Sequence, residues 1–296
     1  MNKKLRLGLL ILLILGLQIV IGVVFIKPYI FTWGSTSQEV LMSMPGDHLS
    51  PFISSTRSIT INASISNVWD WVIQLGADRG GFYSYWFIER PLGYKFRETS
   101  RIEAEFKDME AGRVIKTSLD PSMSFIEYNF PVVSVDSGKS FVLKNWGCFL
   151  LNEVDSTRTR LIVRTHGQSL SSWTDYLDYF FMMPLHYLME RRMLIGIKAR
   201  SEVGPGEPFS STNDILWFLG IFLSFCGIVV LLFTSKTIQS ESVVVLYSVI
   251  WLLILFIADP IPIYYTALLL ILVINILWQN KNKIGKKKTF IKPRKI

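Results

Sequence analysis

Four long runs of apolar residues restrict what this chain can fold into. They cover residues 7–26, about 215–233, about 243–258 and 261–278. A helix needs about 20 such residues to cross the roughly 30 Å hydrocarbon core of a bilayer, and charged side chains are strongly disfavoured at its centre. The last two runs are a little short unless flanking residues extend them. The pattern therefore predicts about four transmembrane α-helices.

The first run has to be distinguished from a cleaved signal peptide. It is longer than the apolar region of such a peptide, about 7–15 residues, and no A-x-A cleavage site follows it. We therefore expect residues 1–31 to form an N-terminal transmembrane anchor. No run carries a charge at its centre, which favours anchoring over transport. Gln18 and Asn275 are polar positions through which helices can join by hydrogen bonds.

Basic residues at both ends of the chain predict its orientation. Lys3, Lys4 and Arg6 precede the first run, and residues 281–296 form a basic tail. Positive flanks stay in the cytoplasm, and four spans return the chain to the side on which it began. We expect an integral protein of the cell membrane with both termini cytoplasmic and the soluble part outside. Beside a span, the tail favours membrane lipid as its partner over nucleic acid.

Residues 44–203 have the length of one globular domain. A polar segment, residues 32–43, precedes it as a linker, and the breaker Gly204-Pro205-Gly206 follows it. Three transmembrane helices then occupy residues 214–280. The chain has two cysteines, Cys148 inside the domain and Cys226 in a predicted span, so we expect no disulfide between them. The domain must therefore be stabilised by its core.

The domain pattern is a strand, two short helices, a series of strands and a long helix. Residues 57–62 alternate as a strand does, and residues 64–76 and 83–92 have helical spacing. Short β-rich segments follow at 114–117, 125–130, 132–135, 141–144, 148–153 and 161–165. Residues 172–201 form a long helix with one broad apolar stripe, and Glu190-Arg191-Arg192 are expected on its solvated face. The fold class is α+β, a curved antiparallel sheet with a long C-terminal helix across it, enclosing an apolar cavity.

Specific residues add a family resemblance over about 44–202. They are Met44-Pro45-Gly46-Asp47, Gln74-Leu75-Gly76, the run Arg79-Gly80-Gly81-Phe82-Tyr83-Ser84-Tyr85, Trp146 and Arg160-Leu161-Ile162-Val163-Arg164. This part of the chain resembles the START-like or SRPBCC superfamily with its helix-grip fold, and most of all bacterial members labelled polyketide cyclase-like. Trp86 departs from the pattern, since an acidic residue is expected there. The resemblance implies that a lipid, a polyketide-like or another apolar molecule binds in the cavity, without implying a reaction.

Aromatic residues are the candidates for the cavity lining. Tyr83, Tyr85 and Trp86 are expected near its mouth, although core packing is the more common role of such side chains. The other candidates lie on the strands and the long helix: Phe125, Tyr128, Trp146, Phe149, Tyr176 and Phe180.

Polar candidates are fewer. Arg101, Glu105, His166 and Glu89 are the charged residues that could do acid–base work, and no positioned partner is evident for any of them. Arg79-Gly80-Gly81 reads as a structural turn rather than an anion site. Three widely spaced histidines and the lack of a CxxC motif argue against zinc, so we expect no metal and no cofactor.

Three functions remain open from the sequence. The first is a membrane-anchored module that binds, transfers or senses a hydrophobic small molecule. The second is a cyclase-like or hydrolase-like enzyme with a polar pair in the cavity, such as Arg101 with Glu105 or His166. The third is an interaction protein whose cavity is filled by its own aromatic side chains. The sequence names no protein partner.

Overall fold

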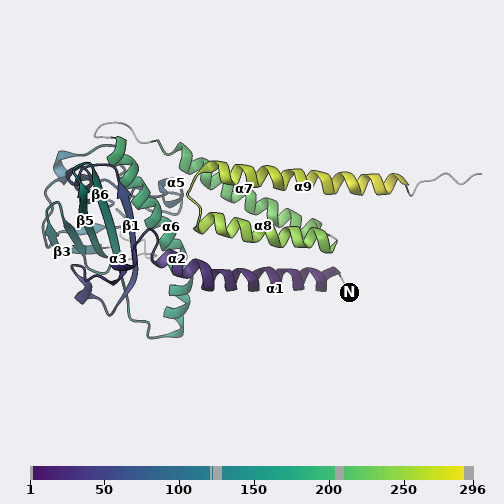
Figure 1. Ribbon diagram of the computed structural model, residues 1–296, viewed down its shortest axis with the longest axis horizontal. Coiled ribbons are helices and arrows are strands. Elements are labelled where there is room, and N and C mark those ends of the chain that lie inside the picture. Colours follow the sequence, from purple (N-terminus) through teal and green to yellow (C-terminus); the bar gives the residue numbers. More distant parts are fainter. Residues whose placement is uncertain (1–2, 121, 123–128, 204–209, 236, 290–296) are drawn as a thin grey trace, which may run out of the picture. The chain divides into compact units, whose positions relative to one another are not determined.

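A computed structural model describes residues 3–120, 122, 129–203, 210–235 and 237–289 (Figure 1). The chain divides into two compact units. One consists of Met1–Ile26 with Ser210–Ile296, and the other is Lys27–Phe209. The first holds the apolar helices and the second holds the β-sheet, so the chain has a helical unit and a mixed unit.

Among the residues that the structure describes, three helices are long and apolar enough to cross a membrane. They cover Lys4–Phe31, Thr212–Thr234 and Ile238–Phe256. The first is built from α1 (Lys3–Ile21), the π-helical η1 (Gly22–Ile26) and α2 (Lys27–Phe31), and the others are α7 and α8. The fourth expected span lies in α9 (Pro262–Thr289), whose apolar part, Pro262–Ile276, is shorter than the others. Its crossing of the membrane stays a prediction.

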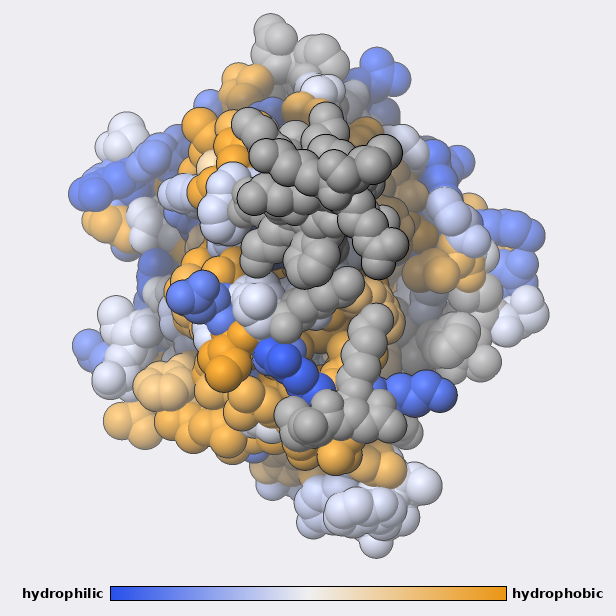
Figure 2. All heavy atoms as spheres, turned by 90° about the vertical axis from the view of Figure 1, so that its right-hand side faces the viewer, coloured by the Kyte–Doolittle hydropathy of each residue, from blue (hydrophilic) through white to orange (hydrophobic). Residues whose placement is uncertain are grey.

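Within the helical unit, α7 packs against α8 and α9, and α1 packs against α8. The Asn275 amide donates a 2.8 Å hydrogen bond to the Tyr247 hydroxyl, which confirms that Asn275 joins two helices. Arg6 on α1 forms a 2.6 Å ion pair with Glu241 on α8. Figure 2 shows orange hydrophobic side chains among blue hydrophilic ones on the face seen there. Within the helical unit, Leu12, Phe222 and Leu270 are among the large hydrophobic side chains that are exposed. This is the surface expected of helices that have lipid as their solvent.

The mixed unit contains a six-stranded antiparallel sheet in the order β1-β6-β5-β4-β3-β2. The strands are β1 (Phe52–Ile61), β2 (Val114–Lys116), β3 (Asn129–Asp136), β4 (Ser140–Leu143), β5 (Gly147–Asp155) and β6 (Arg158–Gly167). The predicted α+β class and antiparallel sheet are confirmed. From β2 to β6, strands that follow one another in the sequence are paired, and β1 pairs with the last strand, β6.

The long helix α6 (Trp173–Val203) contacts β1 and the short helix α4 (Ile65–Val72). The main core lies on this side of the sheet. There Leu161 and Val163 of β6 belong to one cluster with Met193, Leu194 and Ile197 of α6. The C-terminal half of α6 is thus a core element.

A short connection follows α4. Its first part turns back at Gly81, whose φ of +86° is in the left-handed region. A Cβ at this position would lie only 2.7 Å from the Arg97 carbonyl oxygen, so glycine is required. Arg79 donates to the Phe106 carbonyl and stacks on the Phe106 ring. The run from Arg79 to Gly81 is therefore bound within the unit itself, as a structural turn. Helix α5 (Trp86–Glu89) follows, shorter than expected, and the 3₁₀ turn η3 (Ala104–Phe106) comes next.

The segment expected as a linker is folded onto the other side of the sheet. It contains α3 (Ser37–Leu41), and the 3₁₀ turn η2 (Asp47–Leu49) follows. Arg164 of β6 donates to the carbonyls of Glu39, Val40 and Met42 at 2.7–3.0 Å, and forms a 2.7 Å ion pair with Asp47. Polar composition suggested a linker, but here polar groups of the segment satisfy a buried arginine.

Two further expectations about α6 are wrong. Glu190, Arg191 and Arg192 are not solvated, because each is at most 3% exposed. Glu190 pairs with Arg57 of β1, and the Arg191 guanidinium lies over the rings of Trp33 and Tyr187. The apolar stripe is also split, since its C-terminal residues are in the core and its N-terminal residues are exposed.

Replacing Arg164 by Met should lower the free energy of unfolding by about 3 kcal/mol, because Asp47 and three carbonyls lose a buried cation. The matched control is Arg158→Met on the same strand, where the ion pair with Asp155 is equally short at 2.7 Å but exposed. We expect a much smaller effect there. Guanidinium unfolding of the full chain in detergent, followed by near-UV circular dichroism, measures both. Equal losses would show that burial does not give Arg164 its importance.

Candidate functional site

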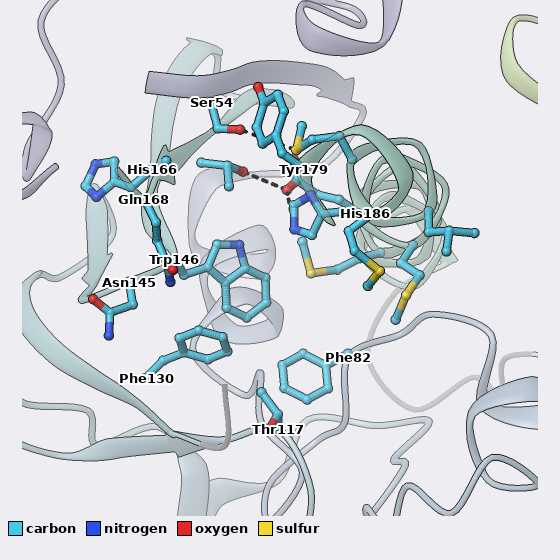
Figure 3. A pocket seen from close by; sticks show the side chains of 18 of the residues that line it. Ser54, Phe82, Thr117, Phe130, Asn145, Trp146, His166, Gln168, Tyr179 and His186 are labelled. Atoms are coloured by element: carbon cyan, nitrogen blue, oxygen red, sulfur yellow. Dashed lines mark hydrogen bonds and ion pairs between the residues drawn. The ribbon is translucent and has the colours of Figure 1, made fainter. Parts of the chain in front are cut away.

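A cavity of about 530 Å³ lies between the sheet and the N-terminal half of α6 (Figure 3). Its wall on α6 is rich in methionine, with Met182, Met183, Met189 and Met193. Methionine side chains are flexible and polarisable, and they adapt to apolar partners of irregular shape. The volume falls within the roughly 300–1,000 Å³ typical of sites for small molecules.

Aromatic rings form the opposite wall. The Trp146 ring, in the turn between β4 and β5, lies 5.0 Å from the Phe130 ring and 5.8 Å from the Phe82 ring. Phe149 supports Trp146 from the core at 5.5 Å. The buried indole Nε1 of Trp146 has no hydrogen-bond partner among the residues that the structure describes. The wall therefore combines apolar surface with one hydrogen-bond donor available to a ligand.

A cluster of charged and polar side chains, buried except for the partly exposed His186, borders the same cavity. The Arg57 guanidinium on β1 forms a 2.9 Å ion pair with Glu190 Oε1, and both side chains are almost completely buried. The Thr165 hydroxyl on β6 donates to Glu190 Oε2 at 2.8 Å, and His186 Nε2 lies 3.5 Å from the same oxygen. Figure 3 shows His186 projecting from α6 towards the cavity. We call Arg57, Thr165, His186 and Glu190 the polar cluster.

The electrostatics of the polar cluster follow from its burial. Burial lowers the pKa of His186, and the neighbouring Glu190 carboxylate opposes that shift. A lowered pKa keeps the imidazole neutral at neutral pH. Its Nδ1 has no hydrogen-bond partner in the described part of the chain. The cluster thus presents a neutral imidazole, held beside a carboxylate, to whatever occupies the cavity.

Glu89 is a second carboxyl group at the cavity, on α5. Burial raises its pKa from 4.5 to about 7, although the Ser84 hydroxyl and the Tyr85 N–H lower it in part. Burial disfavours the charged form of a carboxyl group, so Glu89 is close to half protonated at neutral pH. Glu89 lies about one helical turn after Trp86, the position at which the family resemblance led us to expect an acidic residue.

Three of the residues considered for the site from the sequence border this cavity, namely Trp146, His166 and Glu89. The His166 ring, however, lies on the other side of β6 from Thr165, 4.0 Å from Asp47 (Figure 3). Alternate residues of a strand point to opposite faces, which explains the difference. Burial also lowers the pKa of His166.

The other aromatic candidates that the structure describes lie away from the cavity lining. Tyr83 is buried beneath Arg200, whose guanidinium is 4.5 Å from the ring, and Tyr85 is buried beside Phe87. Trp86 packs against Arg90, and Phe149 is in the core. Tyr176 and Phe180 are exposed on α6. Phe125 and Tyr128 are outside the described residues.

The polar pairs suggested by the sequence are not formed. Arg101 pairs with Glu103 at 3.0 Å and Glu105 pairs with Arg97 at 3.2 Å, all in exposed or half-buried positions. The polar cluster was missed because its members are far apart in sequence. One signal was present, since His186 and Glu190 are four residues apart on a helix and therefore lie on one face.

The raised pKa of Glu89 predicts a pH dependence of stability. Between pH 4.5 and about 7, the unfolded carboxyl is ionised while the folded one still holds its proton, so stability falls as pH rises and is constant above. Glu89→Gln should remove this loss, giving about 3 kcal/mol more stability than wild type at pH 8 and little difference at pH 4.5. Thermal unfolding of the full chain at both values measures this. Glu105→Gln, the same charge change at an exposed position, is the control, and an identical response in both variants would contradict the assignment.

Comparison of the chain with protein-family models, with curated proteins and with solved structures finds no match. The resemblance to the START-like superfamily therefore stays an interpretation of the residues quoted for it. The functional conclusion depends on the cavity, the polar cluster and the apolar helices of this chain.

Proposed function

We propose that the chain is a membrane-anchored protein whose mixed unit binds a hydrophobic or lipid-like small molecule. The single observation that carries this proposal is the cavity of about 530 Å³, lined by methionine and aromatic side chains. An interaction protein with a cavity filled by its own side chains would lack such a space. Apolar surface supplies most of the affinity in sites of this kind, and a few polar groups orient the ligand.

The order of elements supports a helix-grip fold of the START-like type. A strand, two short helices, a series of antiparallel strands and a long helix follow one another in the chain. The long helix contacts the sheet at β1, and the cavity lies between α6 and the sheet. This is the arrangement that the resemblance implies, with a ligand held between helix and sheet.

The polar cluster and the Trp146 indole N–H indicate that the ligand has a hydrogen-bonding group at one end. The polar side chains are gathered near Glu190, while the methionines and Phe82 and Phe130 provide apolar surface around them. A molecule with one hydrogen-bonding group on a largely apolar body matches this distribution. Such amphiphiles are concentrated in membranes, and anchoring the binding unit there raises their effective concentration.

Native mass spectrometry of the full-length protein, after exposure to a total lipid extract, tests binding. We expect a retained molecule of defined mass in wild type and a reduced bound fraction in Met189→Trp, which fills part of the cavity. The adjacent Leu188→Trp adds the same bulk outside the lining and should bind as wild type does. A bare protein mass under all conditions, or equal binding by the two variants, would refute a ligand in this cavity.

An enzyme is the second candidate, and the His186–Glu190 pair is the observation that favours it. A neutral imidazole beside a carboxylate is the arrangement of a general base, and His186 faces the cavity. Comparing the ligands retained by wild type and by His186→Gln distinguishes the candidates. Identical masses favour binding alone, whereas a changed molecule found only with wild type favours a reaction.

Four spans with cytoplasmic termini are also part of the proposal, and thiol labelling of intact cells tests them. In a Cys226→Ala background, a cysteine at exposed Lys139 should react with a membrane-impermeant maleimide. A cysteine at Lys287, in the basic tail, should react only after permeabilisation. The basic flanks of the first and last helices supply the physical reason. The opposite labelling pattern would invert the orientation.

A further inference from the structure

The N-terminal half of α6 exposes an unusual apolar surface on the mixed unit. Six large side chains there are between 40% and 76% exposed. They recur at helical spacing and lie along one side of residues 173–185: Trp173, Tyr176, Leu177, Phe180, Phe181 and Leu185. Contiguous exposed apolar patches of this kind mark interaction or membrane surfaces. We call these six residues the α6 patch.

The helix that carries the α6 patch is firmly held by its other side. Met183 and Tyr187 of α6 are buried on the side that meets the sheet. The Ser54 hydroxyl of β1 contacts the Met183 sulfur at 3.4 Å. At the N-terminus, the Asp175 carboxylate accepts hydrogen bonds of 2.8 Å from the backbone N–H groups of Ser171 and Ser172. The patch is therefore a fixed feature of the fold rather than a frayed end.

The last turns of the first apolar helix belong to the mixed unit and lie beside the helix that carries the α6 patch. The helix Lys4–Phe31 has 28 residues, which at 1.5 Å per residue is about 42 Å. This length crosses the hydrocarbon core and reaches the headgroup region on the far side. Its last turns, α2, pack against α6 inside the mixed unit, and the Phe31 ring lies 6.2 Å from the Tyr179 ring. Tyr179 lies between Tyr176 and Phe180 in the sequence, so the end of this helix is beside the middle of the segment that carries the patch.

The composition of the patch fits that level of a membrane. Tryptophan and tyrosine are enriched where hydrocarbon meets headgroups, and Trp173 and Tyr176 begin the patch. Leucine and phenylalanine follow, as on the lipid side of helices that lie in the interface plane. On the same turns, Asp175 and His186 are polar and border the cavity instead. The helix is thus amphipathic, with lipid-compatible side chains on the free side.

We propose that residues 173–185 of α6 lie in the interfacial region of the bilayer, with the α6 patch in contact with lipid. Met182 and Leu185 are both exposed and part of the cavity lining, so the patch continues into the cavity wall. The cavity then opens at the lipid surface, and an amphiphile enters it without crossing water. This inference extends the proposed function, but the membrane contact itself does not depend on a bound ligand. The two can therefore fail separately.

Spin labels on the full-length protein in lipid nanodiscs test the contact. In a Cys226→Ala background, where the remaining native Cys148 is buried, one added cysteine replaces Phe180 or Phe181. Power saturation then compares collisions of the label with oxygen, which enters lipid, and with a nickel chelate, which stays in water. The depth parameter, the logarithm of the ratio of these collision rates, should be positive at both sites. Leu41 and Leu92 are the matched controls, since they are exposed leucines of the same unit at 84% and 65%, and their depth parameter should be negative.

Two outcomes would overturn the proposal. A negative depth parameter at Phe180 and Phe181 would place the patch in water. Protection from both reagents, with broadening between spins on different copies, would show that a second copy of the chain covers it. Trp173→Cys provides a third site if either phenylalanine variant unfolds. Native mass spectrometry on the same samples reports ligand binding independently, so lipid contact without a ligand would refute the proposed function alone.

Discussion

The buried ion pair between Arg57 and Glu190 is the constraint on which the mixed unit depends. A buried charged side chain is tolerated only where an opposite charge or hydrogen bonds compensate for its lost hydration. Arg57 lies in the middle of β1, Glu190 lies in the middle of α6, and the Thr165 hydroxyl on β6 completes the carboxylate's contacts. The pair fixes where along the sheet α6 can lie. With Glu190 held there, the turns after it pack into the core and the turns before it diverge over the cavity.

Glu190 separates two halves of α6 that have different surroundings. Met193, Leu194 and Ile197 follow it and are buried in the main core. The residues before it have the cavity on one side and the α6 patch on the other. Methionine suits this part of the helix, because flexible thioethers can line a space that is filled in one state and empty in another. The ion pair with Arg57 attaches the helix to β1 at the boundary between these two parts.

Much of the architecture could be predicted from local patterns, because strand alternation and apolar runs report directly on neighbours along the chain. The strands over 141–144, 148–153 and 161–165 and the long helix over 172–201 are present with boundaries within a few residues. The site depended on contacts between distant residues, and there the predictions were weaker. Charge suggested solvent for Glu190-Arg191-Arg192, yet Arg57, Trp33 and Tyr187 shield them. Aromatic character suggested the cavity for Tyr83, although a stacked arginine and the core surround it.

The stripe on α6 shows why hydrophobic periodicity alone cannot locate a core in a membrane protein. A period of 3.6 residues reports that one side of a helix avoids water, but lipid and protein interior satisfy that demand equally. Phe181 and Ile197 were both expected on one stripe, but sixteen residues at about 100° each put them roughly 160° apart around the helix. Phe181 is 63% exposed, whereas Ile197 is fully buried. Glu190 lies on the same side of the helix as Ile197 and pairs with Arg57, so that side meets the sheet and Phe181 lies on the opposite side. A charged side chain that suggests solvent exposure can therefore mark the buried side of a helix, as Glu190 does on α6.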